Sequence, residues 1–362
     1  MPSSVPKIVE VQVRAVELPM PVSHRTASGV INIAPLVLTD IITDEGVTGR
    51  SMVFSYFAFA LKPLATLTQN LDRLLVGEEL VPQKIAAKLA ASFRLLGPQG
   101  LAGIAVSAID MAVWDALARS KEMSLARLLG GAPKPLQAYS NLGFDGAKEC
   151  ARQAEAFAKM GRRGVKAKIG YATVEEDLEV LRSVRSAIGP DLAIMADYNQ
   201  SLNITDALER CRQLDDEGLT WIEEPVRADE YQNLARIADA TRTPIQGGEN
   251  WWGPTDLMKA VAAGSTDYVM PDIIKIGGVT GWRLVAAVAE LHSKKVSNHI
   301  FPEVSAQLMT ATPTAGWLEF EDWFQAVLLE PIQAPGGHVQ ISDSPGSGLE
   351  WNERVVEQYR VL

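Results

Sequence analysis

The alternation of apolar and polar positions divides the chain into two regions with different periods. In the first region, residues 8–18 alternate as a half-buried strand does. Residues 35–43 and 47–54 flank the turn-forming segment Asp44-Glu45-Gly46, which predicts a β-hairpin. Helical spacing of apolar residues then predicts helices over 58–76, 82–95 and 103–119. Strands followed by helices indicate an α+β domain.

After about residue 135, short apolar segments alternate with longer helical ones. The strand candidates are 136–140, 167–169, 193–197, 221–223, 245–247, 268–271 and 295–297. Helical patterns lie between them, for example at 146–160, 174–188 and 204–217. Strand–helix alternation at this spacing predicts βαβ units and a parallel sheet. Seven or eight such units fit a closed (β/α) barrel.

Two breaks in this pattern suggest the domain boundaries. The segment Leu129-Gly130-Gly131-Ala132-Pro133 interrupts the first region, so we predict an N-terminal domain over 1–132 and a barrel domain over 133–329. The final stretch, 330–362, returns to turns and strands and contains Pro345-Gly346-Ser347-Gly348. We expect this C-terminal segment to pack back on the N-terminal domain.

Composition narrows the class of protein. Of the 362 residues, 47% are hydrophobic and 22% are charged, as in soluble globular proteins with a large core. A net charge of -10 argues against nucleic acid or an anionic membrane as a partner. The two cysteines, Cys150 and Cys211, are too few for a disulfide framework. Because no apolar signal segment opens the chain and no apolar run is long enough to span a bilayer, we predict a cytoplasmic protein.

Charged residues stand at or just after the carboxyl ends of the predicted strands. They are Lys166, Lys168, Asp197, Glu223, Glu249, Asp272, His299 and Glu319. From Lys168 onward they follow one another at intervals of 20 to 29 residues, about one βα unit per step. In a barrel, residues so placed converge on the rim where the active sites of this fold lie. One charged loop residue would carry little weight, but a series over successive strands predicts a catalytic site.

Three carboxylates come from three successive strands: Asp197, Glu223 and Glu249. Brought together, they repel one another unless a cation or basic side chains neutralise them. Salt bridges to lysines are one solution. An oxygen-only ligand set without cysteine favours the other, a hard divalent ion such as Mg²⁺. We therefore predict a Mg²⁺ site at these three residues.

Two basic groups in the series suit proton transfer. Lys166 and Lys168 are two residues apart on a strand and so face the same side. Neighbouring ammonium groups lower each other's pKa, which suits a general base near neutral pH. On a neighbouring strand, Asp272 is expected to contact the ring of His299, fix its tautomer and raise its basicity.

The motifs around these residues resemble the mandelate racemase branch of the enolase superfamily, across essentially the whole chain. They are AIDMAVWD at 108–115, KAK at 166–168, DYNQS at 197–201, WIEEP at 221–225, GENW at 248–251, MPD at 270–272, KIGGVTGW at 275–282 and ATPTA at 311–315. Muconate-lactonizing relatives carry a lysine five residues before the Gly-Gly pair. Asp272 stands at that position here, which favours the racemase branch.

The resemblance implies a fold and a reaction. The fold is an α/β, modified TIM (β/α)7β barrel whose N-terminal α+β domain caps the barrel mouth. In the reaction, Mg²⁺ stabilises the enediolate that forms when the proton α to a carboxylate is removed. Lys168 acts on one face of the α-carbon, and His299, oriented by Asp272, acts on the other.

The resemblance also gives roles to residues around the two bases. Lys166 is expected to lower the pKa of Lys168 and to contact the substrate carboxylate. Glu319 is expected to hydrogen-bond a carboxylate oxygen as charge develops. Asn199 is a candidate contact for the α-hydroxyl.

Two lid segments of the capping domain, 20–33 and 54–59, are expected to close over the site. The residues expected to line the cavity with apolar surface are Ile31, Phe54, Tyr56, Leu95 and Ile300. His24 and Glu321 stand where a related racemase that binds an aryl group would present apolar residues. Burying either without a partner costs about 1–3 kcal/mol, so an unsubstituted arylglycolate is not the expected substrate.

Two opposed bases favour a racemase or epimerase of a 2-hydroxy carboxylic acid. An acid-sugar dehydratase is the alternative, because the same residues could serve it with His299 as the acid on the leaving 3-hydroxyl. A non-catalytic scaffold would lack a metal ligand or a base, and none is missing. The expected partner is a small-molecule carboxylic acid, and the resemblance further implies a homo-oligomer, in this family an octamer.

Overall fold

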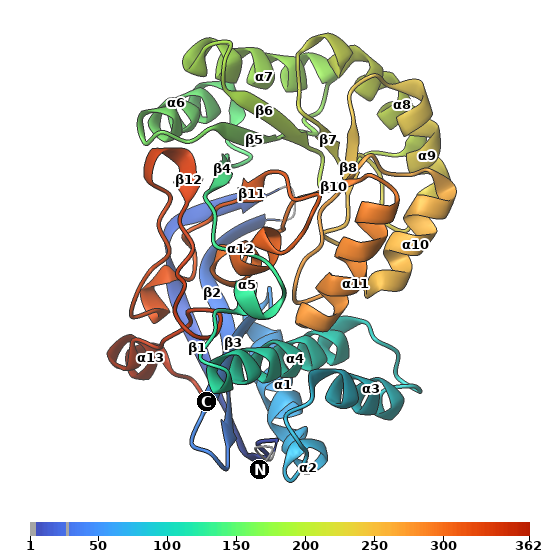
Figure 1. Cartoon of the computed structure of the whole chain (residues 1–362). Helices are drawn as coiled ribbons and strands as arrows, with labels where there is room; N and C mark the ends of the chain where they lie inside the picture. The colour runs from blue at the N-terminus through green and yellow to red at the C-terminus, as the bar shows by residue number, and fades with distance from the viewer. Residues whose placement is uncertain (1–4, 27–28) are drawn as a thin grey trace.

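The computed structural model describes residues 5–26 and 29–362, which form a smaller N-terminal domain and a larger barrel (Figure 1). The N-terminal domain contains an antiparallel sheet in the order β1-β2-β3, followed by helices. The strands are β1 (Ile8–Thr26), β2 (Gly29–Thr43) and β3 (Thr48–Phe54). The helices are α1 (Ala58–Asn70), α2 (Asp72–Leu75), α3 (Pro82–Ser92), α4 (Gly100–Ser120) and α5 (Leu125–Leu128).

The predicted hairpin forms between β2 and β3. Thr43 N donates to Val47 O at 2.9 Å, which closes the turn. Gly46 has a φ of 78°, a left-handed conformation that glycine adopts without steric cost. The turn-forming segment therefore sets the register in which β2 and β3 pair.

β1 and β2 extend further than their hydrophobic alternation predicted. Their pairing continues beyond Pro19, through a register shift, to His24 opposite Ile31. The first lid segment, expected over 20–33, is therefore largely a two-stranded ribbon. Its residues Ala27 and Ser28 lie outside the described part of the chain.

Helix α4 is the central helix of the N-terminal domain. Gly49 on β3 approaches it so closely that a Cβ there would meet Ala112 O at 2.2 Å. Contrary to the expectation from sequence, α4 has the length and apolar composition of a membrane span, but 78% of its apolar window is buried within the fold. Its apolar surface is that of a core helix.

A contact between α4 and the barrel helix α11 (Gly278–Leu291) joins the two domains. Asp110 on α4 accepts hydrogen bonds from the backbone N and the hydroxyl of Thr280, in the first turn of α11. Trp114 Nε1 also donates to Thr280 Oγ1, at 2.9 Å. Asp110 thus satisfies a backbone donor at the start of a helix in the other domain, where a carboxylate is stabilising.

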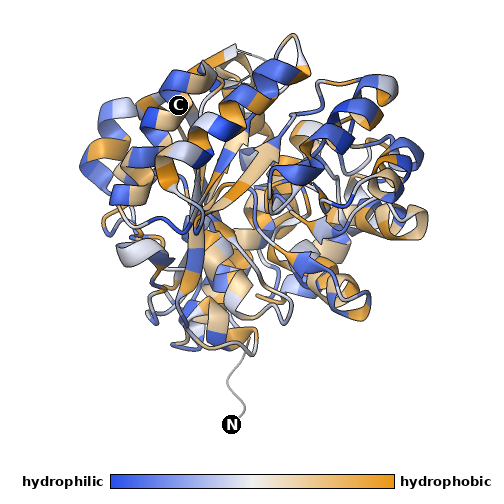
Figure 2. Ribbon diagram, turned by 90° about the horizontal axis from the view of Figure 1, so that it is seen from above, coloured by the Kyte–Doolittle hydropathy of each residue, from blue (hydrophilic) through white to orange (hydrophobic). Residues whose placement is uncertain are grey.

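The barrel consists of parallel strands joined by helices. The strands are β4 (Leu136–Asn141), β5 (Gly164–Lys168), β6 (Ala193–Asp197), β7 (Ile222–Glu223), β8 (Ile245–Gly247), β9 (Tyr268–Val269), β10 (Lys295–Val296) and β11 (Leu318–Glu319). Besides α11, the helices between them are α6 (Gly146–Lys159), α7 (Val174–Ile188), α8 (Ile204–Gln213), α9 (Tyr231–Ala240), α10 (Pro254–Ala263) and α12 (Pro302–Thr310). Figure 2 shows alternating hydrophilic and hydrophobic bands on the outer helices, as expected of helices that bury one face.

The sheet curls until its ends approach. The order is β10-β9-β8-β7-β6-β5-β4-β11, so the last strand pairs with the first. A parallel bridge between Val296 and Ala315 joins β10 to the segment that leads into β11. The predicted fold, a capped barrel of the (β/α)7β type, is therefore confirmed for the described residues.

The final part of the chain contacts both domains. β12 (His338–Val339) pairs antiparallel with β4. Helix α13 (Glu353–Tyr359) lies near the N-terminal sheet, and Trp351 Nε1 donates to Asp40 Oδ1 at 2.7 Å. The segment after residue 330 therefore ties the barrel to the sheet.

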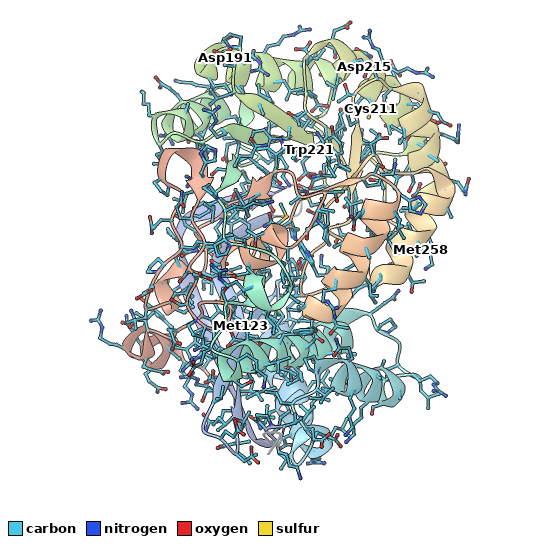
Figure 3. All side chains as sticks on the ribbon, in the orientation of Figure 1. Met123, Asp191, Cys211, Asp215, Trp221 and Met258 are labelled. Carbon is cyan, nitrogen blue, oxygen red and sulfur yellow. The ribbon has the colours of Figure 1, made fainter. Side chains whose placement is uncertain are left out.

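Large buried side chains fill the barrel beneath the rim. Figure 3 shows Trp221 inside the barrel. The centroid of its indole ring lies 5.6 Å from that of the Tyr139 ring and 6.1 Å from that of the Tyr268 ring. Trp221 Nε1 also donates to Glu223 Oε2 at 3.2 Å. The core thus supports one of the predicted site residues from below. Both cysteines are buried and unpaired.

Candidate active site

The predicted rim residues all lie at the carboxyl ends of the barrel strands. Parallel pairing fixes their spacing on one side, since Lys168 stands opposite Asp197 and Asp197 opposite Glu223. On the other side an isolated bridge sets Asp272 opposite His299. Strand register therefore brings residues together that are 20 to 29 positions apart in the sequence.

Three carboxylates form the predicted metal cluster. Asp197, Glu223 and Glu249 each offer a ligand oxygen, and these atoms lie within 4.8 Å of one another. Asp197 and Glu223 are fully buried and Glu249 is 9% exposed. Burial raises the pKa of Glu223 well above its usual value, although Lys166 opposes the change. Buried oxygen ligands at this spacing fit a hard divalent ion, whose charge would offset their mutual repulsion.

Lys166 lies at the centre of the carboxylates. Its Nζ donates to Glu223 Oε1 at 2.8 Å and is 3.1 Å from Glu319 Oε1. Burial lowers the pKa of Lys166, but Glu223 and Glu319 outweigh burial and hold the pKa well above its usual value. The expectation that Lys166 and Lys168 lower each other's pKa is therefore wrong for Lys166, because carboxylates surround it.

Lys168 points into the cavity and is held by residues at and just after the end of the neighbouring strand, β6. Its Nζ donates to Asp197 Oδ2 at 3.0 Å and to Asn199 Oδ1 at 2.8 Å. Asn199 in turn donates through its backbone N to Asp197 Oδ1 at 2.7 Å. The predicted α-hydroxyl contact, Asn199, thus also orients the ammonium group.

His299 and Asp272 form the predicted dyad. The two atoms that meet are His299 Nδ1 and Asp272 Oδ2, at 2.8 Å, and an ionised carboxylate only accepts, so Nδ1 carries the proton. His299 Nε2 lies 3.3 Å from Glu249 Oε2. Burial lowers the pKa of His299, but Glu249 and Asp272 outweigh burial and raise the pKa to about 9.

Glu319 is held between the two sides of the rim. It accepts a hydrogen bond from Asn141 Nδ2 at 2.6 Å and from the backbone N of Ile300 at 2.7 Å. Burial raises its pKa, but Lys166 and His299 outweigh burial and lower it. Glu319 is therefore an ionised, fixed acceptor in this arrangement.

Strained backbone surrounds the site. Residues other than glycine with left-handed φ include Tyr56 at 61°, Asn199 at 45° and Ile300 at 36°. Such a conformation costs about 1–3 kcal/mol and persists where surrounding contacts determine it. For Ile300 one such contact is the backbone hydrogen bond to Glu319, a detail that no sequence pattern announces.

A cavity of about 490 Å³ lies between the rim and the capping domain. The predicted residues that line it are His24, Ile31, Phe54, Tyr56, Lys166, Lys168, Asn199, Glu249, His299, Ile300 and Glu319. Asp197, Glu223 and Asp272 are buried just behind this wall. Both lid segments thus contribute to the cavity.

Two predicted lining residues lie outside the cavity wall. Glu321 is buried beside it and accepts a hydrogen bond from Asn141 N at 2.8 Å. Leu95, in the segment after α3, is 98% exposed and is not among the residues that line the cavity. His24 does line the cavity, and its ring lies 4.9 Å from that of Trp323. Burial, followed by Lys168, lowers the pKa of His24 to about 3, so its ring is neutral.

Several cavity residues were not expected from the sequence. Lys275, to which the sequence analysis gave no role in the site, lines the cavity and donates to Asn250 Oδ1 at 2.9 Å. Asn250 donates to Glu249 Oε1 at 3.0 Å. The motifs that contain Lys275 and Asn250 were a usable signal, and so was the predicted lid segment 20–33 for Asn32, whereas Trp323 lies in a segment without a signal.

Two family models match the chain. The mandelate racemase / muconate lactonizing enzyme N-terminal domain matches residues 8–130. The enolase C-terminal domain-like model matches residues 149–355. Together they cover the capping domain and nearly all of the barrel.

Individual proteins similar to this chain point to the same family as the two models. A crystal structure of an enolase from Bradyrhizobium, complexed with magnesium and mandelic acid, has a TM-score of 0.95 and 43% identity, covering 100% of both chains. D-galactarolactone cycloisomerase of Agrobacterium fabrum is 32% identical over 98% of this chain and 99% of its own length. L-talarate/galactarate dehydratase of Salmonella typhimurium is 29% identical over 88% of this chain and 81% of its own length. With the rim residues and the capped barrel, these matches show that the chain belongs to the mandelate racemase/muconate lactonizing enzyme family of the enolase superfamily.

Proposed function

We propose that this protein removes the proton α to the carboxylate of a 2-hydroxy acid and returns a proton to either face, as a racemase or epimerase. The observation that carries the proposal is that Lys168 and His299 line the same cavity from opposite parts of the ring, β5 and the end of β10. The carboxylate cluster of β6 to β8 lies between them along the sheet. A substrate carboxylate directed toward that cluster would leave the α-carbon between the two bases.

The carboxylate cluster supplies the metal site of the proposal. Mg²⁺ bound by Asp197, Glu223 and Glu249 would bind the substrate carboxylate and stabilise the negative charge that develops on it. The three buried oxygen ligands and the magnesium in the Bradyrhizobium structure support this assignment.

Proton transfer falls to the two bases. Lys168 Nζ, oriented by Asn199, accepts the α-proton on one face. His299 Nε2 serves the other face, while its Nδ1–H remains bonded to Asp272. Glu319 and Lys166 lie beside the reacting carboxylate, and Glu319 is the group proposed to share a hydrogen bond with it as charge grows.

The cavity wall indicates the class of substrate. Ile31, Phe54 and Trp323 offer apolar surface, whereas His24 and Asn32 offer polar groups. Because Glu321 does not line the cavity, the case against an unsubstituted aryl group now rests on His24. We propose a 2-hydroxy acid whose substituent has both an apolar face and a polar group.

A dehydratase of acid sugars is the second candidate. Polar cavity residues, His24, Asn32 and Asn141, could hydrogen-bond several hydroxyl groups, and the similarity to L-talarate/galactarate dehydratase favours this reading. His299 would then donate a proton to the leaving 3-hydroxyl. Homo-oligomeric assembly and a cytoplasmic location stay predictions.

The experiment is incubation with Mg²⁺ in D₂O against a panel of aryl and sugar acids, followed by proton NMR. A racemase replaces the α-proton of both enantiomers with deuterium and conserves the carbon skeleton. A dehydratase removes water from the acid and forms a 2-keto acid. If no acid in a broad panel exchanges its α-proton, proton abstraction by this site is rejected.

A further inference from the structure

Tyr56 was expected as apolar lining, but its hydroxyl has a polar partner. The residue lies in the second lid segment, between the end of β3 and the start of α1. Its hydroxyl donates to Asp272 Oδ2 at 2.9 Å. Its ring lies 4.8 Å from that of Phe54, and Lys275 Nζ sits 4.7 Å from the ring centroid. The capping domain therefore reaches the dyad of the barrel through one side chain.

Asp272 is held at both carboxylate oxygens. Oδ1 accepts from Ile274 N at 2.9 Å, which belongs to the barrel. Oδ2 accepts from His299 Nδ1 at 2.8 Å and from Tyr56. Tyr56 and His299 thus share one oxygen atom, so loss of the hydroxyl changes the acceptor to which the imidazole is bonded.

The left-handed backbone of Tyr56 keeps the hydroxyl in place. Its φ of 61° is a conformation that side chains other than glycine seldom adopt. The residues on either side are fixed, since Ser55 N donates to Pro35 O at 3.0 Å and Phe57 N donates to Ser55 O at 2.7 Å. A strained residue held by its neighbours beside a reactive group is typical of positioning functions.

The geometry points to Tyr56 as a positioning residue that couples the second lid segment to the His299–Asp272 dyad and leaves the Lys168 side independent. The hydrogen bonds of Lys168 go to Asp197 and Asn199, which belong to the barrel. The contact of the second lid segment with Asp272 therefore orders the base on one face. The inference rests on the proposed function, because it assigns Tyr56 to one of two opposed bases.

The kinetic test uses Tyr56→Phe, which removes the hydroxyl and keeps the ring. Variants His299→Asn and Lys168→Arg first show which enantiomer each base serves. We expect Tyr56→Phe to slow α-deuterium exchange on the His299 face by about 10-fold, the usual effect of losing such an orienting partner. Exchange on the Lys168 face should keep the wild-type rate. Equal slowing of both faces, or of neither, overturns the inference.

Ser55→Ala is the matched control. Ser55 Oγ lies within hydrogen-bond distance of Pro35 O at 3.3 Å and Phe57 O at 3.0 Å, so the variant removes a hydroxyl from the same segment. It keeps the Tyr56 hydroxyl and the backbone hydrogen bonds on either side of Tyr56. It should leave the ratio of the two exchange rates unchanged. If Ser55→Ala shifts the ratio as Tyr56→Phe does, lid mobility rather than the Tyr56 hydroxyl is responsible, and the inference fails.

A second readout needs no substrate. The chain has four histidines, so histidine labelled with ¹⁵N gives a simple NMR spectrum, in which His299→Asn identifies the His299 signals. Tyr56→Phe should shift the Nδ1–H resonance of His299, and Ser55→Ala should not. An unmoved resonance overturns the inference. If the wild-type protein exchanges no α-proton, the proposed function fails, while this spectrum still tests whether Tyr56 positions the dyad.

Discussion

The two sides of the cavity are built differently. Lys168 stands on a regular strand and is bonded to Asp197, its neighbour in the sheet register. His299 follows a strand of two residues, precedes the left-handed Ile300, and depends on Asp272, which the lid residue Tyr56 also contacts. One base is thus placed by a regular strand and by two side chains of the barrel, Asp197 and Asn199. The other needs a strained loop and a contact from the second domain, so it is the side on which changes in the lid act.

The carboxylate cluster lies between Lys168 and His299, so removing the metal ion should stop proton exchange on both faces of the α-carbon. Exhaustive chelation is expected to abolish α-proton exchange for both enantiomers, because the ion would supply the double positive charge that stabilises the charge developing on the carboxylate. Added Mg²⁺ should restore both rates together, with circular dichroism as the control that the fold survives chelation. Retained exchange on either face after chelation would count against the cluster.

Removing one base should separate the two sides. His299→Asn is expected to stop racemisation and leave exchange of the enantiomer that Lys168 serves; Lys168→Arg should leave the opposite enantiomer. General acid–base groups contribute about 10²–10⁴-fold, so each loss should reach that size. The measurement is deuterium incorporation for each separate enantiomer. If both variants exchange the same enantiomer, the two-base assignment is wrong.

Glu319 contacts both sides and should not distinguish them. Glu319→Gln keeps the size of the side chain but removes the charge that faces Lys166, and the variant should lower kcat on both faces by about 10²-fold. Separate kcat and KM values for each enantiomer check this. An effect confined to one face would place Glu319 with one base rather than with the carboxylate.

The first lid segment, through His24, should affect the pH dependence of stability rather than the exchange rate on one face of the α-carbon. Burial, followed by Lys168, lowers the pKa of His24 to about 3, below its ordinary 6.5. As the pH falls, His24 therefore binds a proton in the unfolded chain before it does so in the folded protein. The contribution of His24 to the free energy of unfolding is complete above pH 6.5 and is lost as the pH drops toward 3. By pH 5 the free energy of unfolding has fallen by about 2 kcal/mol, because each pH unit below 6.5 costs about 1.4 kcal/mol.

His24→Gln should remove this component of acid sensitivity. Urea unfolding at pH 7 and pH 5, for the wild type and the variant, gives the comparison. His338→Gln is the control, since His338 is a histidine away from the cavity wall. Identical acid sensitivity in the wild type and His24→Gln would show that His24 is not buried in this way in solution.

The rim series was readable because barrel strands repeat in sequence. Lys168, Asp197 and Glu223 each end a short apolar strand, and parallel pairing needs no more than that spacing to align them. The prediction that Lys168 lowers the pKa of Lys166 was wrong. Its pKa depends on Glu223 and Glu319, whose approach is decided by side-chain packing and not by the strand pattern.

The sequence by itself determined the barrel, the carboxylate cluster and the two bases, because periodicity and chain order are local properties that a closed ring converts into proximity. That the N-terminal domain caps the barrel was implied by the family resemblance. Tertiary structure alone decided which lid residues meet the rim. It turned the first lid segment into a ribbon, kept Glu321 and Leu95 out of the cavity, and brought the Tyr56 hydroxyl to Asp272 across 216 residues of chain. Such contacts join two domains whose relative placement follows from side-chain packing between them, and no short motif encodes that placement.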